Sequence, residues 1–343
     1  MSLKKVMLTK IKEINRDKLI TLARQIGERN NKSKDYVLRD MFRNFVKYGI
    51  GYTDYLKGDY INLTAKEKET YVTTKSFYQI LSYLNNPKYT QMMNDKIIFN
   101  KIFRNYIGRE WIDLRNTDIE GFKKFLKGKN HVFAKPPTDF GGHGIIKLNV
   151  SSIDNFEKTY NDLMKQELFL VEEEIKQHKE LDKINPYSVV SFRIVTLVKN
   201  NKAYLLANAL RFNLDEAVAT GCSDAYFRLN EKGKVCSRVV DDVANVYEEH
   251  PLTHVKFEDL TIPYVKESFE MALKAALEVP EVRYVGWDIA ITPNGPVLVE
   301  GNEYPSYGVV QYYLFNDEKT GHLKQIADIL GDEMKEIDLW KKH

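Results

Sequence analysis

The residues with the clearest chemical potential lie in GWDIAITPNGPVLVEGN, residues 286–302. Two apolar runs flank Asn294, so we expect a β-hairpin with a loop of three or five residues centred there. Pairing about Asn294 places Asp288 opposite Glu300, with Asn302 on the same face. Because opposed carboxylates repel, they need a cation, and carboxylate and amide oxygens suit a hard one such as Mg²⁺. These three residues are therefore predicted metal ligands; a solvent-facing acidic pair beside a turn is the alternative.

A lysine and a glycine-rich loop form a second candidate site. Lys135 ends the run HVFAK, and Gly141, Gly142 and Gly144 precede the next apolar run at Ile145. Glycines let backbone N–H groups approach an anion, and the lysine adds positive charge, so the segment could hold phosphate. Its order matches neither a Walker P-loop nor a Rossmann fingerprint, and an ordinary glycine-rich hairpin turn explains it equally well.

Charged residues in apolar runs are the remaining candidate site residues. The run LFLVEEEI, residues 168–175, is an apolar strand that turns acidic. Its end could offer backbone acceptors and donors to a flat heteroaromatic ring, although a charged strand end is the simpler explanation. Arg193 and Arg211 lie in apolar runs, where arginine is rare without an anion. They could bind a polyphosphate or carboxylate ligand, or they could form internal ion pairs.

The elements that must position these residues differ along the chain. From about residue 15 to 109, apolar residues recur at helical spacing. Thr64 and Glu67 form a capping-box pattern, a helix is expected over 75–84, and another is expected from about residue 86 to Phe103. This pattern predicts a mainly helical N-terminal region, residues 1–110.

Short strand-like runs begin at His131. Expected helices over 153–165 and 265–279 interrupt them, and a C-terminal helix is expected over 321–337. The pattern predicts an α+β fold with mixed or antiparallel sheets, in lobes covering residues 111–185 and 186–343.

Composition narrows the class of protein. The 343 residues include 43% hydrophobic and 29% charged side chains, which is typical of a folded chain. Two cysteines make neither a disulfide scaffold nor a four-ligand zinc site, which favours a reducing compartment, the cytoplasm. No run is long and apolar enough to span a bilayer, and the first residues do not look like a secretion signal.

The first 50 residues carry 13 Lys/Arg against 5 Asp/Glu. This surplus indicates either solvated helix faces or an anionic partner.

Together and in this order, the motifs resemble those of ATP-grasp enzymes, most closely the branch associated with sugar transfer, over roughly residues 95–338. The resemblance implies two α+β lobes that hold ATP between them. By position, the residues that resemble the family's nucleotide contacts are Lys96, Lys135, Gly141, Gly142, His143, Gly144, Glu172, Glu174 and Ile175, with Glu180 as the candidate ribose contact. The residues that resemble its phosphate-binding arginines and metal ligands are Arg193, Arg211, Asp288, Glu300 and Asn302.

The resemblance implies an ATP-dependent carboxylate–amine ligase with ATP and Mg²⁺, or Mn²⁺, as cofactors. An amine would attack an acylphosphate, with Lys135, Arg193 and Arg211 stabilising the developing charge. The small-molecule carboxylate and amine would be sugar-acid, amino-sugar or amino-acid units of surface polysaccharide, including a sugar-linked acceptor. Residues 303–307 and 215–226 are candidate acceptor-pocket segments.

Two alternatives stay open. One is a kinase that phosphorylates a small-molecule hydroxyl. The other is a non-catalytic nucleotide- or polyanion-binding module that uses the basic N-terminal region. Nucleic acid is not an expected partner, and at most we expect peripheral contact between the N-terminal region and a membrane.

Overall fold

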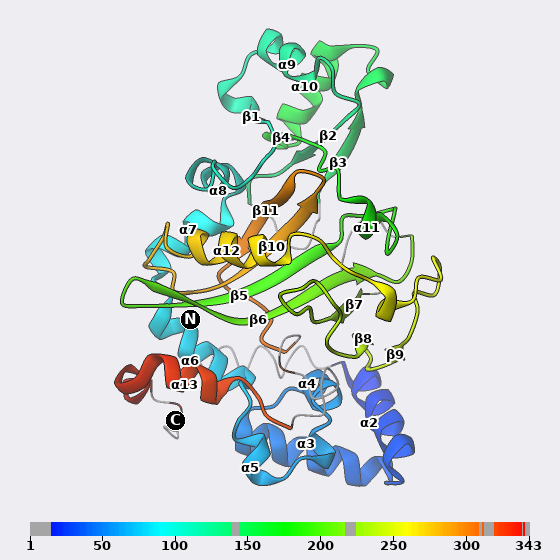
Figure 1. Ribbon diagram of the computed structural model, residues 1–343, viewed down its shortest axis with the longest axis vertical. Coiled ribbons are helices and arrows are strands. Elements are labelled where there is room, and N and C mark those ends of the chain that lie inside the picture. The colour runs from blue at the N-terminus through cyan, green and yellow to red at the C-terminus, as the bar shows by residue number, and fades with distance from the viewer. Residues whose placement is uncertain are drawn as a thin grey trace.

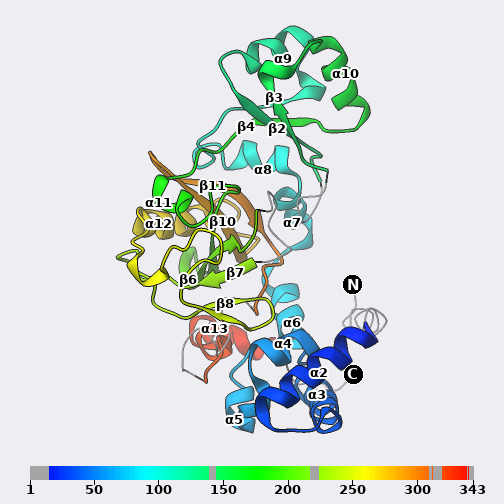
Figure 2. The same cartoon turned by 90° about the vertical axis from the view of Figure 1, so that its right-hand side faces the viewer.

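The computed structural model describes residues 15–138, 144–216, 224–308, 311, 319–337 and 339. Helices lie at one end of the molecule, a four-stranded sheet with two covering helices lies at the other, and a seven-stranded sheet lies between them (Figures 1 and 2). The predicted α+β architecture and the helical N-terminal region are confirmed.

The described helices before the first strand follow the predicted amphipathic pattern. They are α2 (Arg16–Asn30), α3 (Lys34–Tyr48), α4 (Tyr52–Lys57), α5 (Ala65–Lys68), α6 (Thr74–Leu84), α7 (Pro87–Asn94) and α8 (Lys96–Ile102), with a 3₁₀ turn η1 (Tyr60–Asn62). The capping box of Thr64 and Glu67 is confirmed at the start of α5. Buried side chains of α2, α3 and α4 form a separate small core.

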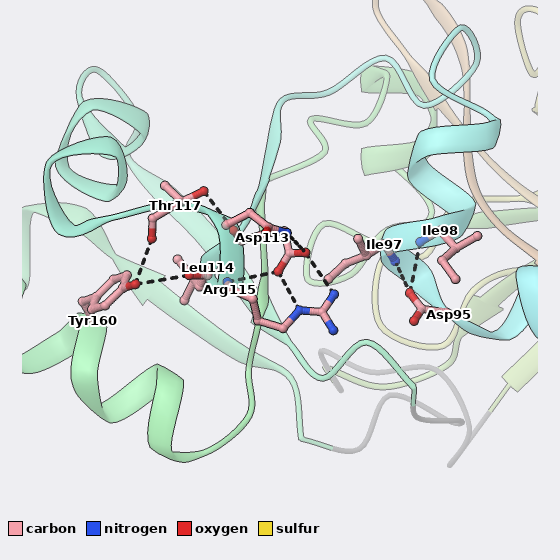
Figure 3. Close-up of polar contacts among 9 residues, drawn as sticks. Asp95, Ile97, Ile98, Asp113, Leu114, Arg115, Thr117 and Tyr160 are labelled. Carbon is pink, nitrogen blue, oxygen red and sulfur yellow. Dashed lines mark hydrogen bonds and ion pairs between the residues drawn. The ribbon is translucent and has the colours of Figure 1, made fainter.

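The single helix expected to run from about residue 86 to Phe103 is wrong. Asp95 is extended, with φ −85° and ψ 107°, and ends α7. Its Oδ1 accepts hydrogen bonds from the backbone N–H groups of Ile97 and Ile98, at 2.9 and 3.0 Å (Figure 3). An aspartate side chain that caps two N–H groups starts a new helix, so α8 begins at Lys96.

The four-stranded sheet is antiparallel, in the order β1-β4-β2-β3. Its strands are β1 (Trp111–Asp113), β2 (His131–Lys135), β3 (Ile146–Asn149) and β4 (Leu170–Glu173), and its helices are α9 (Ile119–Leu126) and α10 (Phe156–Lys165), with 3₁₀ turns η2 (Leu114–Asn116) and η3 (Val150–Ser152). The start expected at residue 153 is therefore wrong for α10. The hydroxyl of Tyr160 on α10 donates to the carbonyls of Leu114 and Thr117 at 3.2 and 2.8 Å, which ties the helix to the end of β1 (Figure 3).

The seven-stranded sheet is also antiparallel, in the order β11-β10-β5-β6-β7-β8-β9. Its strands are β5 (Ser191–Lys199), β6 (Lys202–Asn213), β7 (Asp224–Phe227), β8 (Val239–Asp241), β9 (Val246–Tyr247), β10 (Tyr284–Thr292) and β11 (Gly295–Asn302). The remaining described helices are α11 (Lys179–Asp182), η4 (Phe257–Asp259), α12 (Val265–Ala275), α13 (Leu323–Leu330) and η6 (Gly331–Lys335). The helices expected over 265–279 and 321–337 are thus shorter, and the second breaks at Gly331, where φ is 55°.

Helices cover both faces of the large sheet. On one face α12 packs into the main core around Trp287. On the other face α6 and α13 pack against β5 and β6. The buried Trp287 donates its indole N–H to Thr196 Oγ1 at 2.8 Å, which fixes β10 against β5. The predicted metal strands therefore lie in a rigid, well-packed part of the molecule.

The helical N-terminal region is joined to the segment that follows β11. The side chain of Gln311 accepts from Val72 N at 3.0 Å and donates to Val72 O at 2.5 Å. The hydroxyl of Tyr307 donates to Asp54 Oδ2 at 2.6 Å, and Lys57 forms an ion pair with Asp242 beyond β8. These contacts join the predicted N-terminal region, residues 1–110, to the predicted C-terminal lobe, residues 186–343. The boundaries between the regions stay a prediction.

Candidate active site

The hairpin of β10 and β11 places two carboxylates opposite each other. Asp288 and Glu300 are Cα partners, as predicted. The predicted loop is wrong, because Thr292 pairs with Gly295 and leaves a two-residue turn. The prolines that argued against a short loop are accommodated, since Pro293 lies within the turn and Pro296 lies on the edge strand, where a missing N–H costs little.

A β-bulge reconciles this shorter turn with the predicted pairing. Ile289 pairs with Leu298 while Asp288 pairs with Glu300, so Val299 is an extra residue on β11. Side chains alternate between faces, and a one-residue slip moves every side chain to the other face. Without the bulge Glu300 would stand opposite Trp287, on the core side. The bulge at Val299 therefore brings Glu300 to the face of Asp288.

Asn302 completes a compact cluster of oxygen ligands. Its Nδ2 lies 3.3 Å from Asp288 Oδ2 and 3.2 Å from Glu300 Oε1. Asp288 is only 7% exposed, so the alternative of a solvent-facing acidic pair is wrong. Two carboxylates and an amide whose oxygen can turn inward are a donor set that fits Mg²⁺. Among the described residues, no group of three or more His, Cys, Asp or Glu side chains is arranged to hold a metal ion; this site has two carboxylates and an amide.

Arg193 balances the charge of Asp288. Its Nε and Nη2 donate to the two Asp288 oxygens at 2.5 and 2.8 Å. Burial favours a neutral Asp288, but the adjacent guanidinium outweighs it and lowers the pKa of this carboxyl. Burial, and then the negative charge of Asp288, raise the pKa of Glu300. The two carboxyls thus have different proton affinities, as expected for coupled neighbours.

Arg211 also forms an internal ion pair. Its Nε donates to Asp224 Oδ2 at 2.7 Å, and Asp224 is 1% exposed. Register places Arg193 and Arg211 on one face of neighbouring strands, and Asp288 is an electrostatic neighbour of both. The internal-pair alternative is therefore observed for each arginine. Asp224 lies in the predicted acceptor-pocket segment, residues 215–226, but the sequence did not indicate that it would be the partner of Arg211.

Five predicted site residues line one small cavity. It has a volume of about 50 Å³ and lies between the small sheet and β11. The predicted residues on its wall are Lys96, Lys135, Glu172, Glu300 and Asn302. The backbone N–H of Lys96 donates to Pro137 O at 2.9 Å, which holds the start of α8 beside the segment after β2. Lysines from two segments thus line the same cavity as β11, the metal strand, which carries the predicted ligands Glu300 and Asn302.

Glu172 is the buried centre of this cavity. Its side chain is 3% exposed, Oε1 accepts from Lys135 Nζ, and Oε2 accepts from Arg109 Nε at 3.0 Å. Burial would raise the pKa of Glu172, but Lys135 and then Arg109 lower it to about 2. Arg109 was missed from the sequence. It stands in a short polar stretch, GRE, before β1, and nothing in that stretch distinguishes it from a surface arginine.

The other predicted nucleotide contacts that the structure describes lie outside the cavity wall. Glu174 pairs with Lys147 at 2.7 Å, and Glu180 pairs with Lys183 at 2.7 Å on α11. Ile175 follows β4, and Gly144 has a φ of 71°. Gly141, Gly142 and His143 lie outside the described residues. The assignments of these residues to the nucleotide stay predictions.

The two α+β lobes, with a carboxylate hairpin that shares a cavity with Lys135 of the small sheet and Lys96 of α8, are the arrangement expected of an ATP-grasp protein. The sequence model described as sugar-transfer associated ATP-grasp matches residues 78–326. The chain therefore belongs to the sugar-transfer associated ATP-grasp family, and the predicted resemblance is confirmed.

Comparison with curated proteins found no match. Solved structures with similarity include the ATP-grasp ligase PsnB complexed with minimal precursor, at 14% identity and TM-score 0.42, covering 72% of this chain and 63% of that one. The D-alanine–D-alanine ligase from Bacillus anthracis has 14% identity and TM-score 0.42, covering 79% of this chain and 78% of that one. N5-carboxyaminoimidazole synthase from Aspergillus clavatus has 10% identity and TM-score 0.41, covering 65% of this chain and 48% of that one. The chain thus spans less than two thirds of the PsnB chain.

No described helix is long and apolar enough to cross a membrane.

Proposed function

We propose that this protein is an ATP-dependent carboxylate–amine ligase. The observation that carries the proposal is the meeting, in one cavity, of Lys96, Lys135 and Glu172 with the metal-strand residues Glu300 and Asn302. Cationic side chains facing an oxygen-donor cluster suit a nucleotide polyphosphate that is bound together with a hard cation.

The lysines and the hairpin residues would bind different parts of Mg-ATP. Lys96 and Lys135 would contact phosphate oxygens, and Asp288, Glu300 and Asn302 would hold Mg²⁺, or Mn²⁺, which supplies positive charge to the transferring phosphoryl group. ATP and a carboxylate substrate would give an acylphosphate and ADP, and attack by an amine would give an amide and phosphate. No covalent bond to the protein is required.

The two arginines would act on the reacting carboxylate. Arg193 and Arg211 share a face of the large sheet beside the metal ligands. Fixed guanidiniums in a largely buried site stabilise developing negative charge far better than water does, because they need no reorganisation. Tyr304, which is 55% exposed, follows the metal strand directly and would line the acceptor pocket.

The family's description supports substrates connected with sugar transfer. We propose a sugar-acid, amino-sugar or amino-acid unit of surface polysaccharide, with a sugar-linked acceptor, and the cytoplasm as the compartment. Contact of the basic N-terminal region with an anionic membrane surface stays a prediction; on α3, Phe42 and Val46 are 68% and 67% exposed.

The test is an ADP- and phosphate-release screen of pooled carboxylates crossed with pooled amines, followed by mass spectrometry of the product. We expect release only when both pools are present, and an amide product. Lys135→Ala and Asp288→Asn should lower turnover at least about 100-fold, the usual effect of removing one transition-state contact. Lys123→Ala and Asp328→Asn, which change surface ion-paired residues, are the matched controls.

Two outcomes would overturn the proposal. A stable phosphorylated product without an amide would identify a kinase. Nucleotide binding without turnover across the whole panel would identify a binding module.

A further inference from the structure

Arg109 is held by three separate parts of the structure. Its side chain is 5% exposed, and Nε donates to Glu172 Oε2 on β4 at 3.0 Å. Nη1 donates to Leu298 O on β11 at 2.8 Å and to Ile107 O at 3.1 Å. A guanidinium cannot lose its charge in a protein, and its planar fork serves several acceptors at fixed angles. The cation is therefore permanent and well fixed.

The segment that carries Arg109 lies directly on the edge of the large sheet. Leu298 N donates to Tyr106 O at 2.8 Å, so both polar backbone groups of Leu298 bind this segment. Gly108 has a φ of 56°, and a Cβ there would lie 2.4 Å from Val297 Cγ1. Only glycine allows so close an approach in that conformation. Arg109 is thus anchored beside the bulge at Val299 that orients Glu300.

The charges around Glu172 leave one cation in excess. Glu172 carries one negative charge, and it contacts two cations, Lys135 and Arg109. With a single cationic partner, a buried carboxylate would hold that partner strongly, because breaking a buried pair exposes an uncompensated charge. The second cation removes this penalty, since Glu172 stays paired when one partner leaves.

We infer that Arg109 is a positioning residue, the permanent counter-ion of Glu172 that keeps Lys135 available to nucleotide phosphates. This inference rests on the proposed function, in which Lys135 contacts the phosphates. Arg109 itself stays bound to Glu172 and to the two carbonyls. Lys135, whose side chain is 16% exposed, is the partner that can turn toward a ligand.

The experiment measures binding of ADP and of adenosine to the full chain by calorimetry at constant Mg²⁺. In Arg109→Met, Lys135 becomes the only cation for Glu172, so ADP affinity should fall at least about 10-fold, or about 1.4 kcal/mol. Adenosine, which has no phosphate, should change by less than about 3-fold. In Arg109→Met combined with Glu172→Gln, Lys135 is released, and ADP affinity relative to adenosine should return to within about 3-fold of the unmodified chain.

The double variant separates this role from direct contact between Arg109 and phosphate. If Arg109 touched phosphate, that contact would still be missing in the double variant, so the recovery of ADP affinity would be no larger than the gain that Glu172→Gln alone gives in the unmodified background. Arg115→Met is the matched control, because Arg115 makes a two-point ion pair with Asp113, at 2.9 Å for both contacts, away from the cavity wall (Figure 3). It should leave ADP affinity unchanged.

Three results would overturn the inference. These are unchanged ADP affinity in Arg109→Met, an equal loss for ADP and adenosine, or a double variant as weak as the single one. Thermal unfolding of each variant identifies misfolding, and because Glu172→Gln removes the buried carboxylate that Arg109→Met deprives of a partner, the double variant can be tested even if Arg109→Met does not fold. If the unmodified chain binds neither ADP nor ATP, the proposed function fails instead.

Discussion

Replacing Arg193 with methionine tests the electrostatics of the proposed metal site most directly. The side chains of Arg193 and Asp288 are 15% and 10% exposed, so their ion pair is largely desolvated. Methionine keeps much of the volume but leaves Asp288 uncompensated beside Glu300. Removal of one partner from a buried pair costs about 3–5 kcal/mol. We expect the free energy of unfolding in EDTA to fall by about 3 kcal/mol, a value at the low end because the pair retains some exposure.

A divalent cation should reverse much of this loss. The variant site carries one more uncompensated negative charge than the unmodified site, so it should bind Mg²⁺ more tightly. At 100 times its dissociation constant, Mg²⁺ would add about 2.7 kcal/mol to the stability of the folded variant. Urea unfolding with EDTA and at one fixed Mg²⁺ concentration measures both effects.

The matched control is Arg283→Met. Arg283, which immediately precedes β10, pairs with Glu333 at 2.8 Å; the two side chains are 22% and 28% exposed, and neither residue lines the cavity of the site. Pairs with such access to solvent contribute about 0–1 kcal/mol, and Mg²⁺ should not change the result. The reasoning would be refuted if Arg193→Met were as stable as the unmodified chain in EDTA, or if it gained no more from Mg²⁺.

Three further predictions concern the surroundings of the site. Gly301→Ala should lower the free energy of unfolding by about 1–3 kcal/mol, because its Cβ would lie 2.9 Å from the buried ring of Trp287, and urea unfolding measures this. Burial lowers the pKa of His250 from 6.5, so the folded state resists protonation. Its stabilising effect is complete above pH 6.5 and should be lost as the pH falls below that value; unfolding at a series of pH values, with His250→Gln as the comparison, detects the slope. Gln311→Leu removes both hydrogen bonds to the buried backbone of Val72 and should lower stability by about 1–3 kcal/mol in the same urea assay, whereas an unchanged midpoint would contradict it.

The pairing of Asp288 with Glu300 could be predicted from the sequence because its signal is local. Apolar alternation fixes which face Asp288 and Glu300 share, and the fold retains that pairing. The predicted loop of three or five residues was wrong, because the structure reaches the same pairing with a two-residue turn and a bulge at Val299. Beside the bulge, the edge strand contacts the segment before β1, and these long-range contacts are not visible in any local pattern.

Other residues of the site depend on long-range contacts. The break between α7 and α8 was missed because Asp95 fits a helical pattern as well as a cap position, and its side-chain hydrogen bonds decide between them. Arg109 was missed for a different reason. Its partners, on β4 and β11, are distant in sequence, so its burial follows from the fold alone. Local patterns therefore predicted that the candidate ligands Asp288 and Glu300 face each other, but not the residues that hold the site in place.

The joint between the helical region and the segment after β11 limits how this chain can be divided or recombined. Phe77 on α6 packs against Tyr307, with ring centroids 4.7 Å apart, and Tyr307 in turn donates to Asp54 on α4. A shortened chain that began near α7 would leave the exit of the metal strand without its support. In chimaeras between relatives, the helical region and the segment after β11 that carries Tyr307 and Gln311 should be exchanged together, because these two residues pack against and bind the helical region.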